Sequence, residues 1–229
     1  MSKEKVLGIL GGMGPQATAD FMIKIIRATK AGRDQENIRM LVDCNPKVPP
    51  RVEAILAGGQ SAGPAMAEMA AGLERCGADM LVIACNTAHY YYLNVAEAVS
   101  IPVLNLIDLT VDFLKDQGVE EVLLLGTLAL LQAGLYEVPL QAVGIRLRLP
   151  STVALTDTLE AIRSVKAGKM DRAYRHAEKV ARWCKEEGIS QVILGCTELP
   201  IAFDGVKSAI RFYDPGEISA EAIVRKIKG

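Results

Sequence analysis

Short apolar runs alternate with amphipathic segments along the whole chain, and several of the runs end at glycine or cysteine. Two of the runs are closely alike, since residues 80–85 read MLVIAC and residues 191–196 read QVILGC. A short apolar run bounded by turn-forming residues predicts a strand that is buried on both faces of a parallel sheet. Alternation of such strands with helices is typical of an α/β fold with mostly parallel sheets.

Cys85 and Cys196 each follow directly after one of these predicted strands. The residue beyond a parallel strand lies at the carboxyl edge of the sheet, where open α/β folds bind their ligands. Because one cysteine lies in each half of the chain, we expect a site that is assembled from both halves.

The two halves also repeat the same order of elements, which predicts two pseudo-symmetric α/β domains. We expect a first domain formed by residues 1–100 and completed by 209–229, and a second formed by 101–208. The residue patterns predict strands at 6–10, 40–42, 122–125 and 145–149, and helices at 17–29, 62–76, 108–117, 156–167, 171–187 and 217–227. Residues 47–60 carry two prolines and a glycine pair, which predicts a loop with a single helical turn.

Composition excludes several classes of function. The 229 residues carry a formal net charge of −1, so no strong field draws in nucleic acid or an acidic membrane surface. No apolar stretch approaches the roughly 20 residues of a membrane span, and the amino terminus has no signal-peptide pattern. An odd count of five cysteines in a chain of this length does not indicate a disulfide scaffold. We therefore expect a reduced, cytoplasmic protein with neither a nucleic-acid nor a membrane partner.

The cysteines differ in their surroundings. Cys76 and Cys184 lie in helical, apolar segments and are expected to be core residues. Cys85 and Cys196 lie at strand–helix junctions, where the amino end of a helix stabilises a thiolate. The polar residues that follow are expected to cap those helices and to offer donors to a bound anion; they are Asn86, Thr87 and Thr197.

Two thiols in matching positions suit the inversion of a carbon centre. Inversion removes a proton from one face of the carbon and returns a proton to the other face. One group on each side, the first a thiolate and the second a thiol, can do both and exchange states at each turnover.

Two other readings of these motifs are weaker. Cys44 and His89 could join the two junction cysteines as zinc ligands, but no close pair of ligands anchors such a site. The glycine turn at residues 11–14 lacks the spacing and the lysine of a nucleotide site. We expect it to bring backbone amides to a small carboxylate or to form a tight turn.

The junctions resemble the signature blocks of the aspartate/glutamate racemase family. The similar segments are residues 8–15 (GILGGMGP), 84–90 (ACNTAHY) and 194–200 (LGCTELP), with further blocks at 43–46 (DCNP), 49–51 (PPR) and 166–168 (KAG). The resemblance runs from about residue 5 to residue 218, in the family's order. Cys44 departs from it, because the family often has asparagine there, and residues 128–133 are more apolar than the family's turn.

The resemblance implies a cofactor-independent amino-acid racemase with two α/β domains, an active site in the cleft between them, and a dimeric assembly. It implies no metal and a small acidic amino acid as substrate. It assigns catalysis to Cys85 and Cys196, and substrate carboxylates to Arg51 and Lys166. The full substrate-binding set that it implies is Met13, Arg51, Asn86, Thr87, Thr127, Lys166, Thr197 and Glu198.

The second cysteine block bears on the substrate. Glutamate-specific members of the family that this chain resembles typically have the sequence Cys-Thr-His at this point. This chain has Cys196-Thr197-Glu198, which favours aspartate as the substrate. Racemisation of glutamate or of a broader set of amino acids stays open, as do a non-catalytic binder of acidic metabolites and a zinc hydrolase. We expect a supporting role for His89, and Glu198 is a candidate for tuning the Cys196 thiol.

Overall fold

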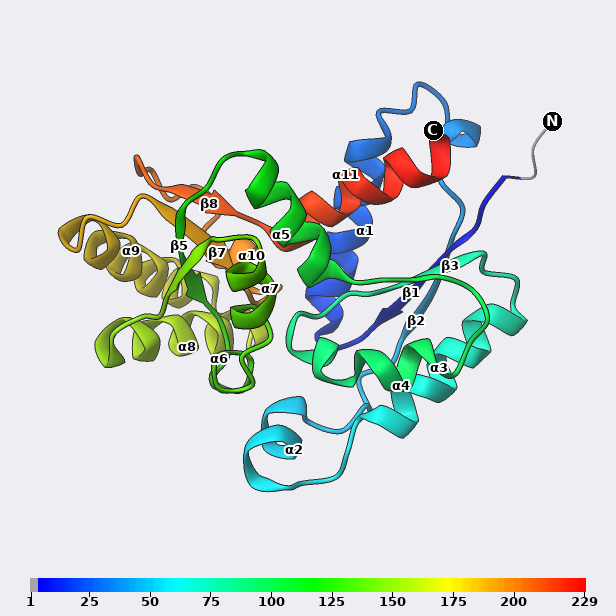
Figure 1. The fold of residues 1–229 in the computed structure, drawn as a ribbon, viewed down its shortest axis with the longest axis horizontal. Coiled ribbons are helices and arrows are strands. Elements are labelled where there is room, and N and C mark those ends of the chain that lie inside the picture. The colour runs from blue at the N-terminus through cyan, green and yellow to red at the C-terminus, as the bar shows by residue number, and fades with distance from the viewer. Residues whose placement is uncertain (1–3) are drawn as a thin grey trace. The chain divides into compact units, whose positions relative to one another are not determined.

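The computed structural model describes residues 4–229 and places their strands in two parallel sheets of identical topology (Figure 1). The first sheet has the order β2-β1-β3-β4, and the second has the order β6-β5-β7-β8. Each series therefore begins with a central strand, adds the next strand on one side, and adds the last two on the other side. This confirms the predicted α/β class and the predicted repeat of one architecture.

The elements follow the predicted alternation of strand and helix. In chain order they are β1 (Leu7–Gly11), α1 (Pro15–Thr29), η1 (Asp34–Glu36), β2 (Met40–Cys44), α2 (Arg51–Ala57), α3 (Gly63–Arg75), β3 (Met80–Ile83), η2 (Thr87–Tyr91), α4 (Tyr92–Ala96), β4 (Val103–Leu104), α5 (Leu106–Asp116), β5 (Glu121–Leu125), α6 (Leu128–Gln132), α7 (Glu137–Ala142), β6 (Arg146–Arg148), α8 (Thr152–Lys166), α9 (Met170–Glu186), β7 (Gln191–Leu194), α10 (Leu199–Ala202), β8 (Arg211–Tyr213) and α11 (Pro215–Lys228).

The chain divides into two compact units. Unit 1 holds the residues up to Leu109 together with Gly216–Gly229, and unit 2 is Thr110–Pro215. These boundaries differ from the expected ones at 100/101 and 208/209. The reason is strand pairing: β4 pairs with β3 and so completes the first sheet, while β8 pairs with β7 and completes the second.

In unit 1 the strand residues alternate between two apolar layers. Leu7 and Ile9 pack with α1 and α11 on one face of the sheet, whereas Leu10 packs with α3 and η2 on the other. This is the period-2 alternation of a strand. The same alternation along β3 puts Leu81 and Ile83 on the α3 face, and Cys85 continues in phase with them.

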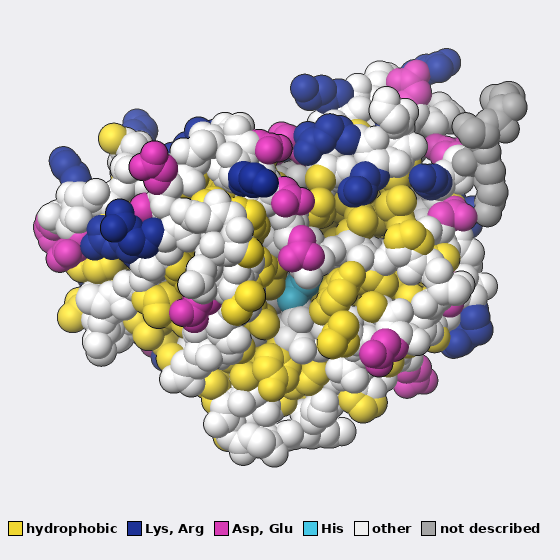
Figure 2. Space-filling view, viewed as in Figure 1, with side chains coloured by type: hydrophobic (Ala, Val, Ile, Leu, Met, Phe, Trp, Pro, Cys, Tyr) yellow, Lys and Arg dark blue, Asp and Glu magenta, His cyan; other side chains and the backbone are white. Residues whose placement is uncertain are grey.

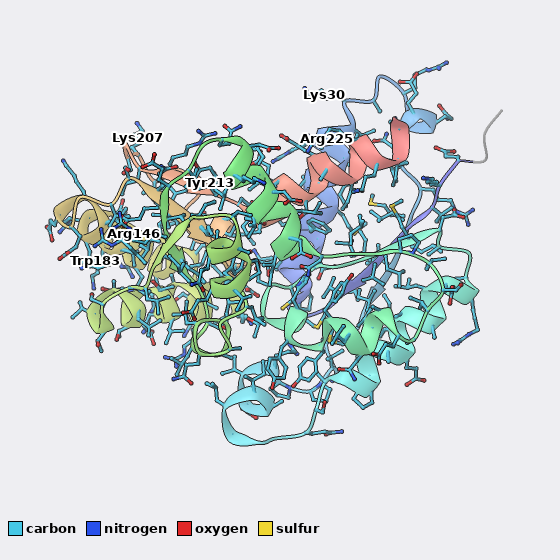
Figure 3. All side chains as sticks on the ribbon, in the orientation of Figure 1. Lys30, Arg146, Trp183, Lys207, Tyr213 and Arg225 are labelled. Carbon is cyan, nitrogen blue, oxygen red and sulfur yellow. The ribbon has the colours of Figure 1, made fainter. Side chains whose placement is uncertain are left out.

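Unit 2 has a comparable layer against α8, α9 and α10. Leu123 and Leu125 of β5 and Leu194 of β7 face these helices, and Cys196 lies in the same layer. Trp183 of α9, labelled in Figure 3, is partly buried and packs against this layer. Both cysteines therefore extend the buried face of the strand that precedes them.

Two predicted segments differ in detail. Residues 47–60 contain α2, a seven-residue helix rather than a single turn, because it follows Pro50 directly and ends at Gly58 in the left-handed conformation. β8 was not predicted, because a three-residue edge strand has no clear apolar pattern.

Charged side chains of both signs are interspersed on the face shown in Figure 2. In residues 4–229, no helix combines the length and apolar character that crossing a membrane requires.

Candidate active site

The two junction cysteines occupy equivalent positions in their units. Cys85 lies two residues past the end of β3, and Cys196 lies two residues past the end of β7. In unit 1, the amide of Ala84 donates to the carbonyl of Leu10 at 2.9 Å; in unit 2, the amide of Gly195 donates to the carbonyl of Leu125 at 2.7 Å. The backbone before each thiol is thus fixed to the central strand of its sheet by the same hydrogen bond.

The helices after the cysteines are short. η2 is a five-residue 3-10 helix and α10 has four residues, so neither has the aligned peptide dipoles of a long helix. Asn86 is the N-cap of η2 but makes no capping bond through its side chain, and Glu198, not Thr197, is the N-cap of α10. The predicted capping roles are therefore wrong, and neither cysteine precedes a long helix whose dipole would stabilise a thiolate.

A glycine turn follows β1 in unit 1. Gly12 has φ 87°, and a Cβ added there would lie 2.4 Å from the backbone of Asn45. Its amide donates to Thr18 Oγ1 at 2.9 Å, and the same hydroxyl donates to the carbonyl of Gly14 at 2.8 Å. Thr18, which the sequence analysis did not single out, therefore fixes the turn that the predicted site residue Met13 belongs to.

Arg51 joins two loops of unit 1. Its Nη1 donates to the carbonyls of Val48 at 3.1 Å and Pro49 at 3.0 Å, and its Nη2 donates to the carbonyl of Met13 at 3.2 Å. Met13 and Cys85 belong to the same buried cluster. The guanidinium thus holds the proline-rich loop and the glycine turn together at the carboxyl edge of the first sheet.

His89 supports the backbone of Cys85. Its Nε2 accepts the amide proton of Leu106 at 3.0 Å, so Nδ1 carries the ring proton and donates to the carbonyl of Cys85 at 2.9 Å. Burial lowers the pKa of the imidazole to about 4. A neutral ring with both nitrogens bonded to the backbone holds its neighbours in place and does not exchange protons near neutral pH. This is the supporting role that was expected.

In unit 2, three of the predicted site residues form a connected set. Cys196 Sγ donates to Glu198 Oε2 across 3.0 Å, and Lys166 Nζ lies 3.5 Å from Glu198 Oε1. The Glu198 side chain is 3% exposed and that of Lys166 is 46% exposed. Thr127 follows β5 at the same edge of the sheet, and its hydroxyl caps α6 by accepting from the amide of Leu130 at 3.1 Å.

Two glycines bring the ends of β5 and β7 close together. A Cβ on Gly195 would lie 2.8 Å from the carbonyl oxygen of Leu125, and a Cβ on Gly126 would lie 3.4 Å from the carbonyl oxygen of Gly195. Small residues at both positions therefore let Thr127 and Cys196 emerge from neighbouring strands.

The other three cysteines differ in burial, and one of them differs from its prediction. Cys184 is a core residue whose burial raises its pKa to about 12, as its pattern predicted. Cys76 is exposed at the end of α3, so its predicted place in the core is wrong: the helix ends there and turns the side chain outward. Cys44 is exposed at the end of β2. Between residues 4 and 229, no three His, Cys, Asp or Glu side chains are grouped closely enough to hold a metal ion.

Each unit therefore gathers its share of the predicted residues at one sheet edge. Unit 1 contributes Met13, Arg51, Cys85, Asn86 and Thr87, and unit 2 contributes Thr127, Lys166, Cys196, Thr197 and Glu198. Their substrate contacts, and the meeting of the two thiols in one cleft, stay predictions.

Comparisons with known proteins show the family to which the chain is similar. Residues 10–223 match the family model described as Asp/Glu/Hydantoin racemase. The chain is 26% identical over 228 residues to the broad specificity amino-acid racemase RacX of Bacillus subtilis, with 96% of each protein covered. An aspartate racemase structure from Picrophilus torridus has a TM-score of 0.90 and 32% identity, covering 98% of this chain and 94% of that one.

A glutamate racemase from Francisella tularensis, 16% identical with a TM-score of 0.69, shares the fold over all of this chain and 82% of its own. The family match extends over nearly the whole length and includes both cysteine junctions. The chain therefore belongs to the Asp/Glu/hydantoin racemase family and is an isomerase of the racemase class.

Proposed function

We propose that this protein interconverts L- and D-aspartate, with Cys85 and Cys196 as the two groups that exchange a proton with the α carbon. The observation that carries the proposal is the equivalence of the two thiols. Each lies two residues past the third strand of its sheet, on the buried face, with the preceding amide bonded to the central strand. Duplicate placement of one reactive group supports a reaction that needs the same chemistry on two faces of a carbon.

The proposed reaction begins with one cysteine as thiolate and the other as thiol. The thiolate removes the α proton, and electrons from the broken C–H bond pass into the adjacent carboxylate to give an enolate-like state. The second thiol then protonates the opposite face of the carbon. Each positioned proton transfer contributes about 10²–10⁴ in rate, so donors that stabilise the enolate-like charge must supply much of the remainder.

The donors available in unit 1 suit a carboxylate. The Arg51 guanidinium has five N–H groups in a planar fork, and three of its hydrogen bonds anchor it to the backbone. A guanidinium held in this way is pre-oriented for an anion. We assign it to one substrate carboxylate, with Asn86 and Thr87 beside Cys85 as further donors.

The choice of aspartate rests on two observations. Glutamate-specific racemases typically have a histidine at the position of Glu198. The Picrophilus torridus protein, named an aspartate racemase, is 32% identical across nearly the whole chain. A broad range of amino acids is the second candidate, because the relative RacX is named a broad specificity amino-acid racemase.

Chiral chromatography tests the substrate directly. Purified protein is incubated without added cofactor with each L- and D-amino acid in turn, and both enantiomers are measured over time. The proposal expects aspartate to be racemised fastest from either enantiomer. Faster turnover of glutamate or of neutral amino acids would transfer the assignment to the second candidate, and no turnover of any amino acid would contradict both.

A further inference from the structure

Unit 2 has a cavity of about 850 Å³ that lies away from the cysteine junction. The carboxyl half of α9, the loop at residues 205–210 and the residues just before β7 line it, and all of them belong to unit 2. Because β7 and β8 are parallel and Cys196 follows the end of β7, the cavity and this thiol lie at opposite edges of the second sheet. Cavities of about 300–1,000 Å³ are the size that small organic ligands occupy.

Three cations lie on the rim of this cavity. Arg182 and Lys185 lie one turn apart on α9, and Lys207, labelled in Figure 3, lies on the loop before β8. Within residues 4–229, none of the three forms an ion pair with a carboxylate. Among the described lining residues Glu178 is the acidic one, so the rim carries a formal excess of two positive charges. Three acidic residues are close in sequence but do not line the cavity: Glu186, Glu187 and Asp204.

The helix dipole accounts for only one of these cations. A cation in the last turn of a helix is stabilised by the partial negative charge of the helix end, and Lys185 has this place in α9. Arg182 lies before that turn, and Lys207 belongs to no helix. Cations from two separate elements thus converge on one hollow, which favours a ligand with more than one negative charge.

The floor of the cavity is apolar. Ala181, Ile189 and Ile210 line it and are at most 9% exposed. All three belong to the buried layer between the second sheet and its helices. An apolar floor below a few polar groups is the usual composition of a small-molecule pocket. The apolar or aromatic body of a ligand can rest on this floor while its charged end reaches the rim.

The polar groups on the rim fit phosphate. The planar fork of Arg182 can bind two phosphate oxygens at once, and each lysine adds a point charge. Ser208 Oγ accepts the amide proton of Ile210 at 3.1 Å, so its own hydroxyl proton stays available to a ligand. Ser190 adds a second hydroxyl to the lining. A single carboxylate, with one charge and two oxygens, would use only part of this set.

We propose that this cavity binds a phosphorylated small molecule of nucleotide size. Arg182, Lys185 and Lys207 hold its phosphate groups, and its apolar or aromatic body rests on Ile189 and Ile210. The site goes beyond the proposed racemase reaction, because it uses none of the proposed active-site residues and lies at the other edge of the sheet. Binding there makes and breaks no covalent bond.

Equilibrium dialysis with ADP as the probe tests the site directly. The full-length protein is dialysed against radiolabelled ADP at low salt, with and without saturating L-aspartate. We expect one ADP per chain, bound equally with and without aspartate. No binding at about 1 mM ADP, or displacement of ADP by aspartate, would overturn the proposal. Inorganic pyrophosphate should compete more weakly than ADP, and equal affinities would show that the apolar floor is not used.

Variants on the rim give shifts of opposite sign. Arg182→Gln removes the planar fork and should weaken ADP binding at least about tenfold. Glu178→Gln removes a negative charge from the rim and should tighten binding by a few-fold. Arg175→Gln is the matched control, because this arginine lies two turns earlier on α9 and outside the cavity. All three side chains are exposed, so the substitutions leave the core unchanged.

An Arg182→Gln protein that binds ADP as tightly as wild type would overturn the proposal, as would an equal loss in Arg175→Gln. Raising the NaCl concentration from about 0.05 M to about 0.5 M should also weaken binding, since the rim charges are exposed to solvent. Dialysis does not depend on racemisation. A protein that racemises no amino acid therefore still tests this site, and a racemase that binds no ADP keeps the proposed function and loses this inference.

Discussion

His89 Nδ1 donates to the carbonyl oxygen of Cys85 at 2.9 Å, while Nε2 of the same ring accepts the amide proton of Leu106. The ring thus ties the loop after β3 to the first turn of α5 within unit 1. Because both bonds need the neutral Nδ1–H tautomer, protonation of the ring at Nε2 breaks one of them.

This relationship predicts a loss of stability in acid. The pKa of His89 falls from its ordinary 6.5 to about 4 on burial, so the unfolded chain binds the extra proton between these values. The contribution of the neutral ring is complete above pH 6.5 and is lost as the pH falls toward 4. We expect the free energy of unfolding to be about 2 kcal/mol lower at pH 5 than at pH 7 from this group alone.

Urea unfolding of wild type and His89→Gln, followed by circular dichroism at both pH values, measures this contribution. The variant should be less stable at pH 7 and should show a pH difference smaller by about 2 kcal/mol. An equal pH difference in the two proteins would show that the histidine does not titrate as described.

Arg51 should be sensitive to a change that keeps its charge. Arg51→Lys removes the planar fork that reaches three carbonyls on two loops, and a single ammonium cannot make all of these bonds. We expect kcat/KM for aspartate to fall at least tenfold, chiefly through KM. Lys47→Ala removes an exposed cation from the same loop and should leave both constants near wild type. Equal effects of the two substitutions would remove Arg51 from the site.

Gly12 should tolerate alanine less well than a glycine with a similar backbone. Gly12 and Gly58 both have positive φ, so alanine is strained at either position. Only at Gly12 would the new Cβ meet backbone, 2.4 Å from Asn45, since nothing lies within 4 Å at Gly58. Gly12→Ala should lower the free energy of unfolding by at least about 2 kcal/mol more than Gly58→Ala. Thermal unfolding of both variants decides this, and equal losses would contradict it.

Trp183 offers a reporter for the packing of unit 2. It is the single tryptophan of the chain and packs against the layer that contains Cys196 (Figure 3). Val180→Ala empties space in that layer and should lower the unfolding free energy seen by tryptophan fluorescence by about 2 kcal/mol. Val153→Ala, at a side chain 70% exposed, should change it by less than about 0.5 kcal/mol. Equal changes would show that the layer is not packed as described.

The sequence alone was sufficient for the architecture because its strongest signals are local. Apolar runs that end at Gly11, Cys85, Leu125 and Cys196 mark strand ends, and the order of runs and helices gives the topology. The structure confirms the α/β class and the repeated sheet. It also confirms the supporting place of His89.

What the sequence could not give depends on contacts between distant residues. The pairing of β8 with β7 assigns residues 211–213 to unit 2, although a three-residue strand carries almost no pattern. Lys166 and Glu198 meet across 32 positions, and Arg51 reaches Met13 across 38. The capping predictions were wrong for a different reason: Asn86 is the N-cap of η2 but makes no capping bond through its side chain, and Thr197 lies one residue before the N-cap of α10.

The central claim is that two thiols serve opposite faces of one carbon, and racemisation in heavy water tests it most directly. One thiol removes the α proton, and the other thiol supplies a different proton that has exchanged with solvent, so the product enantiomer should carry deuterium at Cα while unreacted substrate does not. Cys85→Ser and Cys196→Ser should each lose at least about 10³ in racemisation rate, since each removes one of the two transfers. Cys76→Ser, at an exposed thiol, should keep the wild-type rate. Product that retains the substrate hydrogen, or a single junction variant with full activity, would contradict the account.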